Sequence, residues 1–230
     1  MRENILTVLG VGAGLYLLRN LYVMLLGLPD EAAQGAIYRI MFFHIPSWFV
    51  CFGSCFIAGM SSVYYLVKKD MRADALAVSL TEICLVFCAL GLVTGMIWAR
   101  IIWGIWWTWD PRLTWAFITF IIYCGYLMLR NAIDEPSERA RLSAVVSVLA
   151  CVSVSITYKA IDWWRTQHPS PVLSFRTGGG RIDPAMESLL YNNFFALAML
   201  TVVFVAVRYG QEHDQREIDS LRRQIHALNS

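Results

Sequence analysis

Long apolar runs, separated by short polar stretches, dominate this chain of 230 residues. Most of the runs hold the roughly 20 residues that an α-helix needs to cross a bilayer. The chain is 57% hydrophobic and only 16% charged, which is typical neither of a soluble domain nor of a disordered one. The sequence therefore predicts an all-α integral membrane protein with six transmembrane helices, over about residues 5–28, 40–67, 75–97, 113–129, 142–163 and 188–207.

The first run contains two polar residues, Arg19 and Asn20. Because polar side chains are costly in contact with lipid, both are expected to face protein. The run is too long for the apolar core of a signal peptide, so it is expected to remain as a transmembrane helix. Residues 1–209 are thus predicted to form one six-span domain, and residues 210–230 a cytoplasmic tail.

The tail carries apolar residues at alternating spacings of three and four, namely Ile218, Leu221, Ile225 and Leu228. Such a stripe is typical of a short helix that pairs with a partner helix. The stripe extends over only two heptads, so a frayed surface helix explains it nearly as well.

Positive charge is divided unequally between the two alternate sets of polar segments. One set holds eleven lysines and arginines, namely Arg2, Lys68, Lys69, Arg72, Arg130, Arg139, Arg141, Arg208, Arg216, Arg222 and Arg223. The other set holds six, namely Arg39, Arg100, Arg112, Arg165, Arg176 and Arg181. Cytoplasmic segments of membrane proteins carry the excess of positive charge, so both termini are predicted to be cytoplasmic. The segments before the second run, after the third and after the fifth are then external.

The segment around the external connection after the third run, residues 98–115, holds six of the nine tryptophans. An indole has a large apolar surface and one N–H, so it favours sites with one apolar and one polar side. One interpretation is an aromatic girdle at the membrane interface, in which Asp110 only caps the next helix. A girdle distributes its tryptophans over several spans, however, and their concentration here favours a platform for a large, flat, apolar ligand. The candidate binding residues are Trp103, Gly104, Trp106, Trp107, Trp109, Asp110 and Arg112.

Two histidines belong to the same predicted face. His44 stands two residues before Pro46 and is expected at the membrane surface, just before or within the first turn of the second span. His168 lies in the loop after the fifth span. A lone histidine of this kind usually binds only a carbonyl group or water. Two of them beside an aromatic platform match haem, whose iron takes two axial imidazoles and whose propionates bind cations.

Other ligand classes fit the residues less well. The six cysteines all lie inside apolar runs, where thiols behave as small hydrophobic groups, and no Cys-x-x-Cys-His motif for covalent haem attachment occurs. Zinc would need more Cys, His or carboxylate ligands than the external loops offer. The net charge of only +2, without a basic cluster, argues against nucleic acid.

The segment W-G-I-W-W-T-W-D-P-R-L-T, from Trp103 to Thr114, resembles the tryptophan-rich signature of the haem-handling membrane proteins of cytochrome c maturation. Among these proteins, the chain is similar to the smallest, the six-span haem exporter protein C (CcmC-type) family. Further matches are Tyr38-Arg39-Ile40 leading to His44-Ile45-Pro46, Trp163-Trp164-Arg165-Thr166 leading to His168, and Ile182-Asp183-Pro184-Ala185-Met186. Two departures from the family pattern are Ser47-Trp48 after the His-x-Pro and the proline that follows His168.

The resemblance implies a haem-handling protein of the bacterial inner membrane rather than an enzyme. It implies that haem b is held at the external face, with His44 and His168 as axial ligands of the iron, and is presented to a periplasmic haem chaperone for covalent attachment. It also implies, besides the lipid membrane, two kinds of partner: subunits of an ATP-binding-cassette transporter and a small single-span accessory protein. The alternative is a permease that moves haem or another small solute, with Arg19, Glu82 and Lys159 along its path.

Overall fold

The computed structural model describes residues 2–169 and 183–229. The external loop residues Arg176 and Arg181, the glycine triplet 178–180 and Ile182 of the family match lie outside the described residues. The described chain forms six long helices, α1 (Arg2–Tyr22), α2 (Met41–Lys68), α3 (Met71–Ile102), α4 (Pro111–Ala132), α5 (Pro136–Trp163) and α6 (Pro184–Asn229). A π-helical turn, η1 (Val23–Gly27), extends α1, and a 3-10 turn, η2 (Ala36–Ile40), leads into α2.

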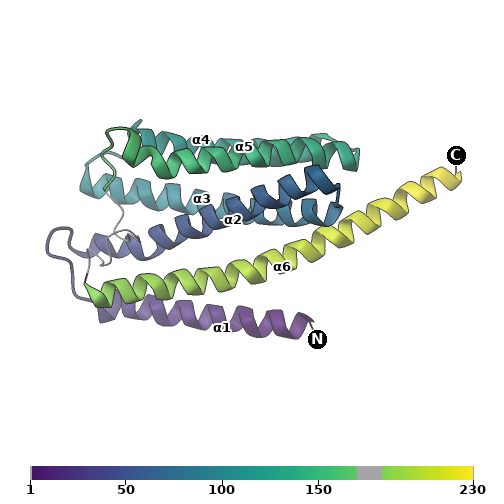
Figure 1. The fold of residues 1–230 in the computed structure, drawn as a ribbon. Coiled ribbons are helices and arrows are strands. Elements are labelled where there is room, and N and C mark those ends of the chain that lie inside the picture. The colour runs from purple at the N-terminus through teal and green to yellow at the C-terminus, as the bar shows by residue number, and fades with distance from the viewer. Residues whose placement is uncertain (1, 170–182, 230) are drawn as a thin grey trace.

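All six helices in the described part of the chain are long and apolar enough to cross a membrane. The predicted fold class, an all-α multi-pass membrane protein, is confirmed. The helices form three neighbouring antiparallel pairs, α1 with α6, α2 with α3, and α4 with α5 (Figure 1). Helix α2 lies centrally and contacts α3, α5 and α6.

The connections fall at two ends of the bundle (Figure 1). The α1–α2 connection, the α3–α4 loop and the end of α5 lie at one end, which we call the loop end. Both termini and the short α2–α3 and α4–α5 turns lie toward the opposite end. The three segments that the sequence assigned to one face therefore do share one end of the molecule.

Acidic caps explain where three of the helices begin. Asp70, Asp110 and Glu135 each accept a hydrogen bond from a backbone N–H of the first turn that follows. Prolines occupy the first position of α4 and α5, where a missing N–H costs nothing. Polar residues of these first turns are helical as well, so α3 and α5 begin earlier than the apolar runs indicated.

The sixth helix does not stop at residue 207 but continues as one helix of 46 residues. It projects beyond the other helices at its C-terminal end (Figure 1). Ion pairs stabilise its first polar turns: Arg208 binds Glu82 of α3 at 2.6 Å, and Arg216 binds Asp74 of α3 at 2.6 Å and Glu212 at 2.9 Å. The tail is thus helical, as its apolar stripe predicts, but it continues α6, because these pairs hold the helix across the polar boundary.

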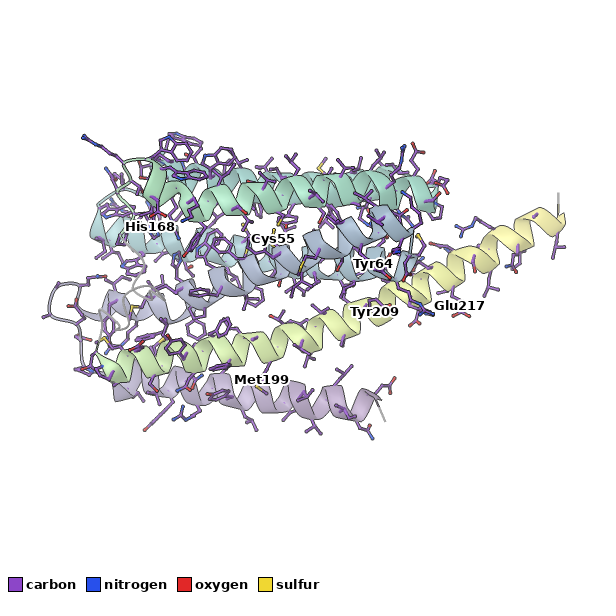
Figure 2. All side chains as sticks on the ribbon, viewed as in Figure 1. Cys55, Tyr64, His168, Met199, Tyr209 and Glu217 are labelled. Atoms are coloured by element: carbon purple, nitrogen blue, oxygen red, sulfur yellow. The ribbon has the colours of Figure 1, made fainter. Side chains whose placement is uncertain are left out.

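The bundle interior is built from small and aromatic residues, and it includes the cysteines of α2 and α3. Cys51 and Cys84 are fully buried, with their sulfur atoms 3.5 Å apart. Figure 2 shows Cys55 inside the bundle, about midway along the helices. These thiols pack among apolar side chains of the core, as expected for small hydrophobic residues.

The two polar residues of the first run behave differently. Asn20 is fully buried, as expected, whereas Arg19 is exposed and donates a hydrogen bond to Asn20 Oδ1 at 3.1 Å. The expectation that both face protein is therefore wrong for Arg19. A long arginine side chain near the end of a span can reach toward the interface without being enclosed by protein.

Candidate functional site

His44 lies within the first turn of α2 and is buried, with 7% of its surface exposed. This is the place in the span that the sequence predicts, and the helical turn of η2 comes directly before it. Its ring is perpendicular to those of Trp98 and Trp48, at centroid distances of 5.8 and 6.4 Å. A Cβ atom on Gly95 would lie 3.0 Å from the imidazole Cε1, so the ring rests directly on α3.

Proline at position 46 has a structural consequence for this turn. Pro46 has no N–H to donate to the carbonyl of Phe42, four residues earlier. That carbonyl instead accepts a hydrogen bond from Asn193 Nδ2 of α6 at 2.8 Å. A buried carbonyl without a partner would be destabilising, so Asn193 both satisfies the turn that carries His44 and joins it to α6.

Thr94 of α3 determines which nitrogen of His44 carries the proton. His44 Nδ1 lies 2.9 Å from Thr94 Oγ1. The single hydroxyl hydrogen of Thr94 is donated to the carbonyl of Leu90 at 2.6 Å. The hydroxyl oxygen therefore accepts from the Nδ1–H of His44, which leaves Nε2 with a free lone pair, the arrangement found in metal-binding histidines.

Trp48, one of the departures from the family pattern, packs against a glycine of α3, Gly91. A Cβ atom on Gly91 would lie only 2.6 Å from Cε2 of the Trp48 ring. The indole therefore occupies the space that a side chain at position 91 would need. The large residue after the His-x-Pro is accommodated by a glycine opposite it.

His168 lies in the segment that follows α5, residues 164–169, which we call the His168 loop. Figure 2 shows it at the loop end of the bundle. Its Nδ1 is 2.9 Å from the carbonyl oxygen of Pro169, which can only accept. Nδ1 therefore carries the proton, and Nε2 is again the free nitrogen. Burial lowers the pKa of His168 to about 4, with the positive charge of Arg112 acting in the same direction, so the imidazole is neutral at pH 7.

Asp110 connects the tryptophan loop (residues 103–110) to the His168 loop. Its carboxylate is buried and accepts hydrogen bonds from Arg112 N at 2.9 Å, Thr166 Oγ1 at 2.7 Å and Gln167 N at 2.8 Å. Thr166 Oγ1 in turn accepts from the backbone N–H of His168 at 3.0 Å. One carboxylate thus caps α4 and holds the neighbouring loop.

The two histidines lie near each other. His168 and Arg112 are both close enough to His44 to interact with it electrostatically, and Arg112 also interacts with His168. Four of the predicted site residues, His44, His168, Asp110 and Arg112, are therefore brought together from α2, the start of α4 and the His168 loop.

The tryptophans of the platform lie in the α3–α4 loop. Trp106 and Trp109 are 55% and 72% exposed. Trp107 and Trp109 pack edge-to-face with each other and with Phe117 of α4, at 5.7–6.5 Å. Gly104 has φ +77°, a conformation that residues with a side chain rarely adopt, and its carbonyl accepts a hydrogen bond from Arg100. The loop therefore offers an exposed aromatic surface whose turn requires glycine.

Comparisons with known proteins show the family of this chain. The model of the family described as Heme exporter protein C matches residues 1–224. The chain belongs to this family. It is 32% identical over 200 residues to Heme exporter protein C of Bradyrhizobium diazoefficiens, covering 87% of this chain and 73% of that protein. It is 28% identical over 180 residues to that of Escherichia coli K12, covering 78% and 72%, and 27% identical over 194 residues to that of Paracoccus denitrificans, covering 84% and 80%.

Membership of the haem exporter protein C family confirms the resemblance seen in the tryptophan-rich segment. The geometry of this member also fits the haem predicted from the sequence. The two imidazoles offer free Nε2 atoms, and no group of three or more His, Cys, Asp or Glu in the described ranges is arranged around another metal ion. Arg112 Nη1 and Trp107 Nε1 are buried without a hydrogen-bond partner among the described residues, and both can donate to a carboxylate.

Three residues that surround His44 in this haem exporter protein C family member were not predicted from the sequence. Trp48 and Trp98, rather than the platform tryptophans, are the ring neighbours of His44. Thr94 fixes the His44 tautomer. A signal existed for α3, since Gly91, Thr94 and Gly95 are small residues on one helical face within an apolar run, a pattern typical of close helix packing.

Proposed function

We propose that this member of the haem exporter protein C family binds haem b at the external face of the membrane and presents it to a periplasmic haem chaperone. The chaperone would then receive the haem by covalent attachment during maturation of c-type cytochromes. One observation carries the proposal: His44 and His168 lie near each other, and each has Nδ1 engaged and Nε2 free. The name of the relatives, Heme exporter protein C, supports haem as the cargo.

Each part of the site has a distinct task in this proposal. The Nε2 atoms of His44 and His168 would hold the haem iron. The guanidinium of Arg112 and the indole N–H of Trp107 bind propionate oxygens. The other platform residues, Trp103, Gly104, Trp106 and Trp109, form the surface beside the macrocycle.

The exposed indoles suit a site that must be reached from outside. An edge of the haem that rests against Trp106 and Trp109 stays accessible to a docking protein, because both side chains are exposed. Holding the haem in one orientation is the positioning that a later attachment step requires. We assign no acid, base or nucleophile of this chain to that step, and propose a haem-handling protein rather than an enzyme.

The location and partners follow from the charge distribution and the family. The greater number of lysines and arginines near the end opposite the loop end supports cytoplasmic termini and a periplasmic site in the bacterial inner membrane. Reporter fusions at Lys69 and Ile133 are expected to be cytoplasmic, and a fusion near Ile105 external; the reverse pattern would refute this orientation. Subunits of an ATP-binding-cassette transporter and a small single-span protein are the proposed membrane partners.

A permease for a small solute is less well supported. It would need its polar residues along one path, but Glu82 binds Arg208 and Lys159 binds Asp162, on different helices. Arg19 is exposed on α1. Ion pairs explain the presence of Glu82 and Lys159, and a position at the membrane interface explains Arg19.

The proposed function is tested by purification and transfer. The purified protein is expected to show a Soret band and a pyridine haemochrome of the b type. Mixing it with the haem-free chaperone should move haem to the chaperone, and the variant in which Trp103, Trp106, Trp107 and Trp109 are all replaced by Ala should transfer less. A protein that purifies without haem and does not bind added haem would contradict the proposal.

A further inference from the structure

The carboxylate of Asp110 has more partners than a helix cap requires. Asp70 caps α3 by accepting from one backbone N–H at 2.9 Å, and Asp110 makes the same bond to Arg112 N at the start of α4. Asp110 additionally accepts from Thr166 Oγ1 and Gln167 N, at 2.7 and 2.8 Å. These two bonds join α4 to a loop 56–57 positions further along the chain.

The bonds lead directly to the backbone of His168. Thr166 has one hydroxyl hydrogen, which it donates to Asp110, so its oxygen is turned to accept from another group. That group is the N–H of His168, at 3.0 Å. The carboxylate therefore orients the hydroxyl, and the hydroxyl restrains the residue that carries the imidazole.

We infer that Asp110 is a positioning residue, which holds His168 in place for iron through Thr166 and Gln167, and does not itself bind the ligand. The inference rests on the proposed function, because it requires His168 to be an axial ligand. Both oxygens of this carboxylate, which is only 6% exposed, are engaged within the chain. A carboxylate in contact with haem would also face the like charge of the propionates.

Two substitutions separate positioning from capping. Thr166→Val removes the hydroxyl and leaves Asp110 with its cap. Asp110→Asn keeps an acceptor for the cap but replaces one carboxylate oxygen by a donor, which cannot accept from Gln167 N. Matched controls are Asp70→Asn, which changes an equivalent cap on α3, and Thr201→Val, which removes a hydroxyl bound only within α6 to the carbonyl of Leu197.

The measurement is the spin state of ferric haem in the purified full-length protein, titrated with imidazole. Thr166→Val and Asp110→Asn are expected to convert part of the low-spin signal to high-spin. Imidazole should bind these variants roughly tenfold more tightly than the wild type, since a loosened ligand competes less. Asp70→Asn and Thr201→Val should behave as the wild type.

The same substitutions in a His168→Ala background decide the route of the effect. A residue that acts only through His168 has no further influence once the imidazole is gone, so Asp110→Asn should then change neither the spectrum nor the affinity for imidazole. A full effect that persists in this background would show that Asp110 contacts the haem and would overturn the inference. So would unchanged spectra of Thr166→Val and Asp110→Asn in a protein whose spectrum responds to His168→Ala. An unchanged spectrum of His168→Ala itself would instead refute the proposed function.

Discussion

The two histidines of the site are held in very different ways. His44 belongs to a transmembrane helix, and its ring is enclosed by Trp48 and Trp98 and rests on Gly95. His168 belongs to a loop, is half-buried, and is restrained through the carboxylate of Asp110. One ligand is therefore part of the bundle, and the other is attached to it by a few hydrogen bonds.

This difference suits a site that must hold a cargo and also give it up. Moving His44 would require repacking of α2 against α3, which close-packed interiors resist. Moving His168 requires only that the hydrogen bonds to Asp110 break. In the proposed function, His44 stays in place beside the iron, and His168 is the ligand that moves away when the haem is released.

The largest expected effect is on haem retention. His44→Ala should lose most of the bound haem, because it removes the fixed ligand, whereas His168→Ala should keep a substantial fraction as a five-coordinate complex. Haem per protein, measured after identical purification, gives the comparison. Equal losses in the two variants would show that the two ligands are held equally firmly.

A second test addresses the packing around His44. Gly91→Ala places a methyl group against Trp48 and should destabilise the protein by about 1–3 kcal/mol through overpacking. The matched control is Gly12→Ala in α1, where a Cβ atom meets nothing within 4 Å. The melting temperature in detergent should fall for Gly91→Ala and not for Gly12→Ala. In a protein that already carries Trp48→Ala, Gly91→Ala should cause no further fall.

Thr94→Val tests the hydrogen bond that fixes the His44 ring. The variant removes the hydroxyl that the Nδ1–H of a buried imidazole donates to, and losing a hydrogen bond behind a metal-binding histidine weakens metal binding by about tenfold or more. Haem affinity and the reduction potential of the bound haem should both change, whereas Thr201→Val should change neither. Wild-type values for Thr94→Val would mean that packing alone orients the ring.

The smallest effect is expected from single changes in the exposed platform. Trp109→Ala removes a side chain that is 72% exposed and packs on Trp107 and Phe117. Aromatic pairs contribute about 0.5–1.5 kcal/mol beyond burial, so haem retention should fall only a few-fold. A loss as large as that of His44→Ala would place this indole among the main determinants of binding.

The sequence was sufficient for the helices and for the shared end of the bundle, because span length and apolar runs determine both. It located His44 and His168 on one side, but not the burial of His44, which depends on the extra turn of η2. It suggested Asp110 as a cap or ligand, but not its bonds to the His168 loop. Contacts between residues so far apart in the chain are created by helix packing, which no local pattern encodes.

The continuity of α6 was missed for a similar reason. The polar residues after position 207 indicated a boundary, but Arg208 and Arg216 have partners on α3 that stabilise the helix there. Hydropathy detects where a span leaves the membrane, whereas helix ends are decided by caps and by ion pairs between helices.

Electron paramagnetic resonance of the ferric protein tests most directly whether His44 and His168 are the two axial ligands of one haem. The wild type should give a low-spin, bis-imidazole signal. His44→Ala and His168→Ala should each give a high-spin signal from whatever haem they retain, and added imidazole should restore low-spin iron in both. If both variants keep the low-spin signal of the wild type, these histidines are not the ligands of the iron.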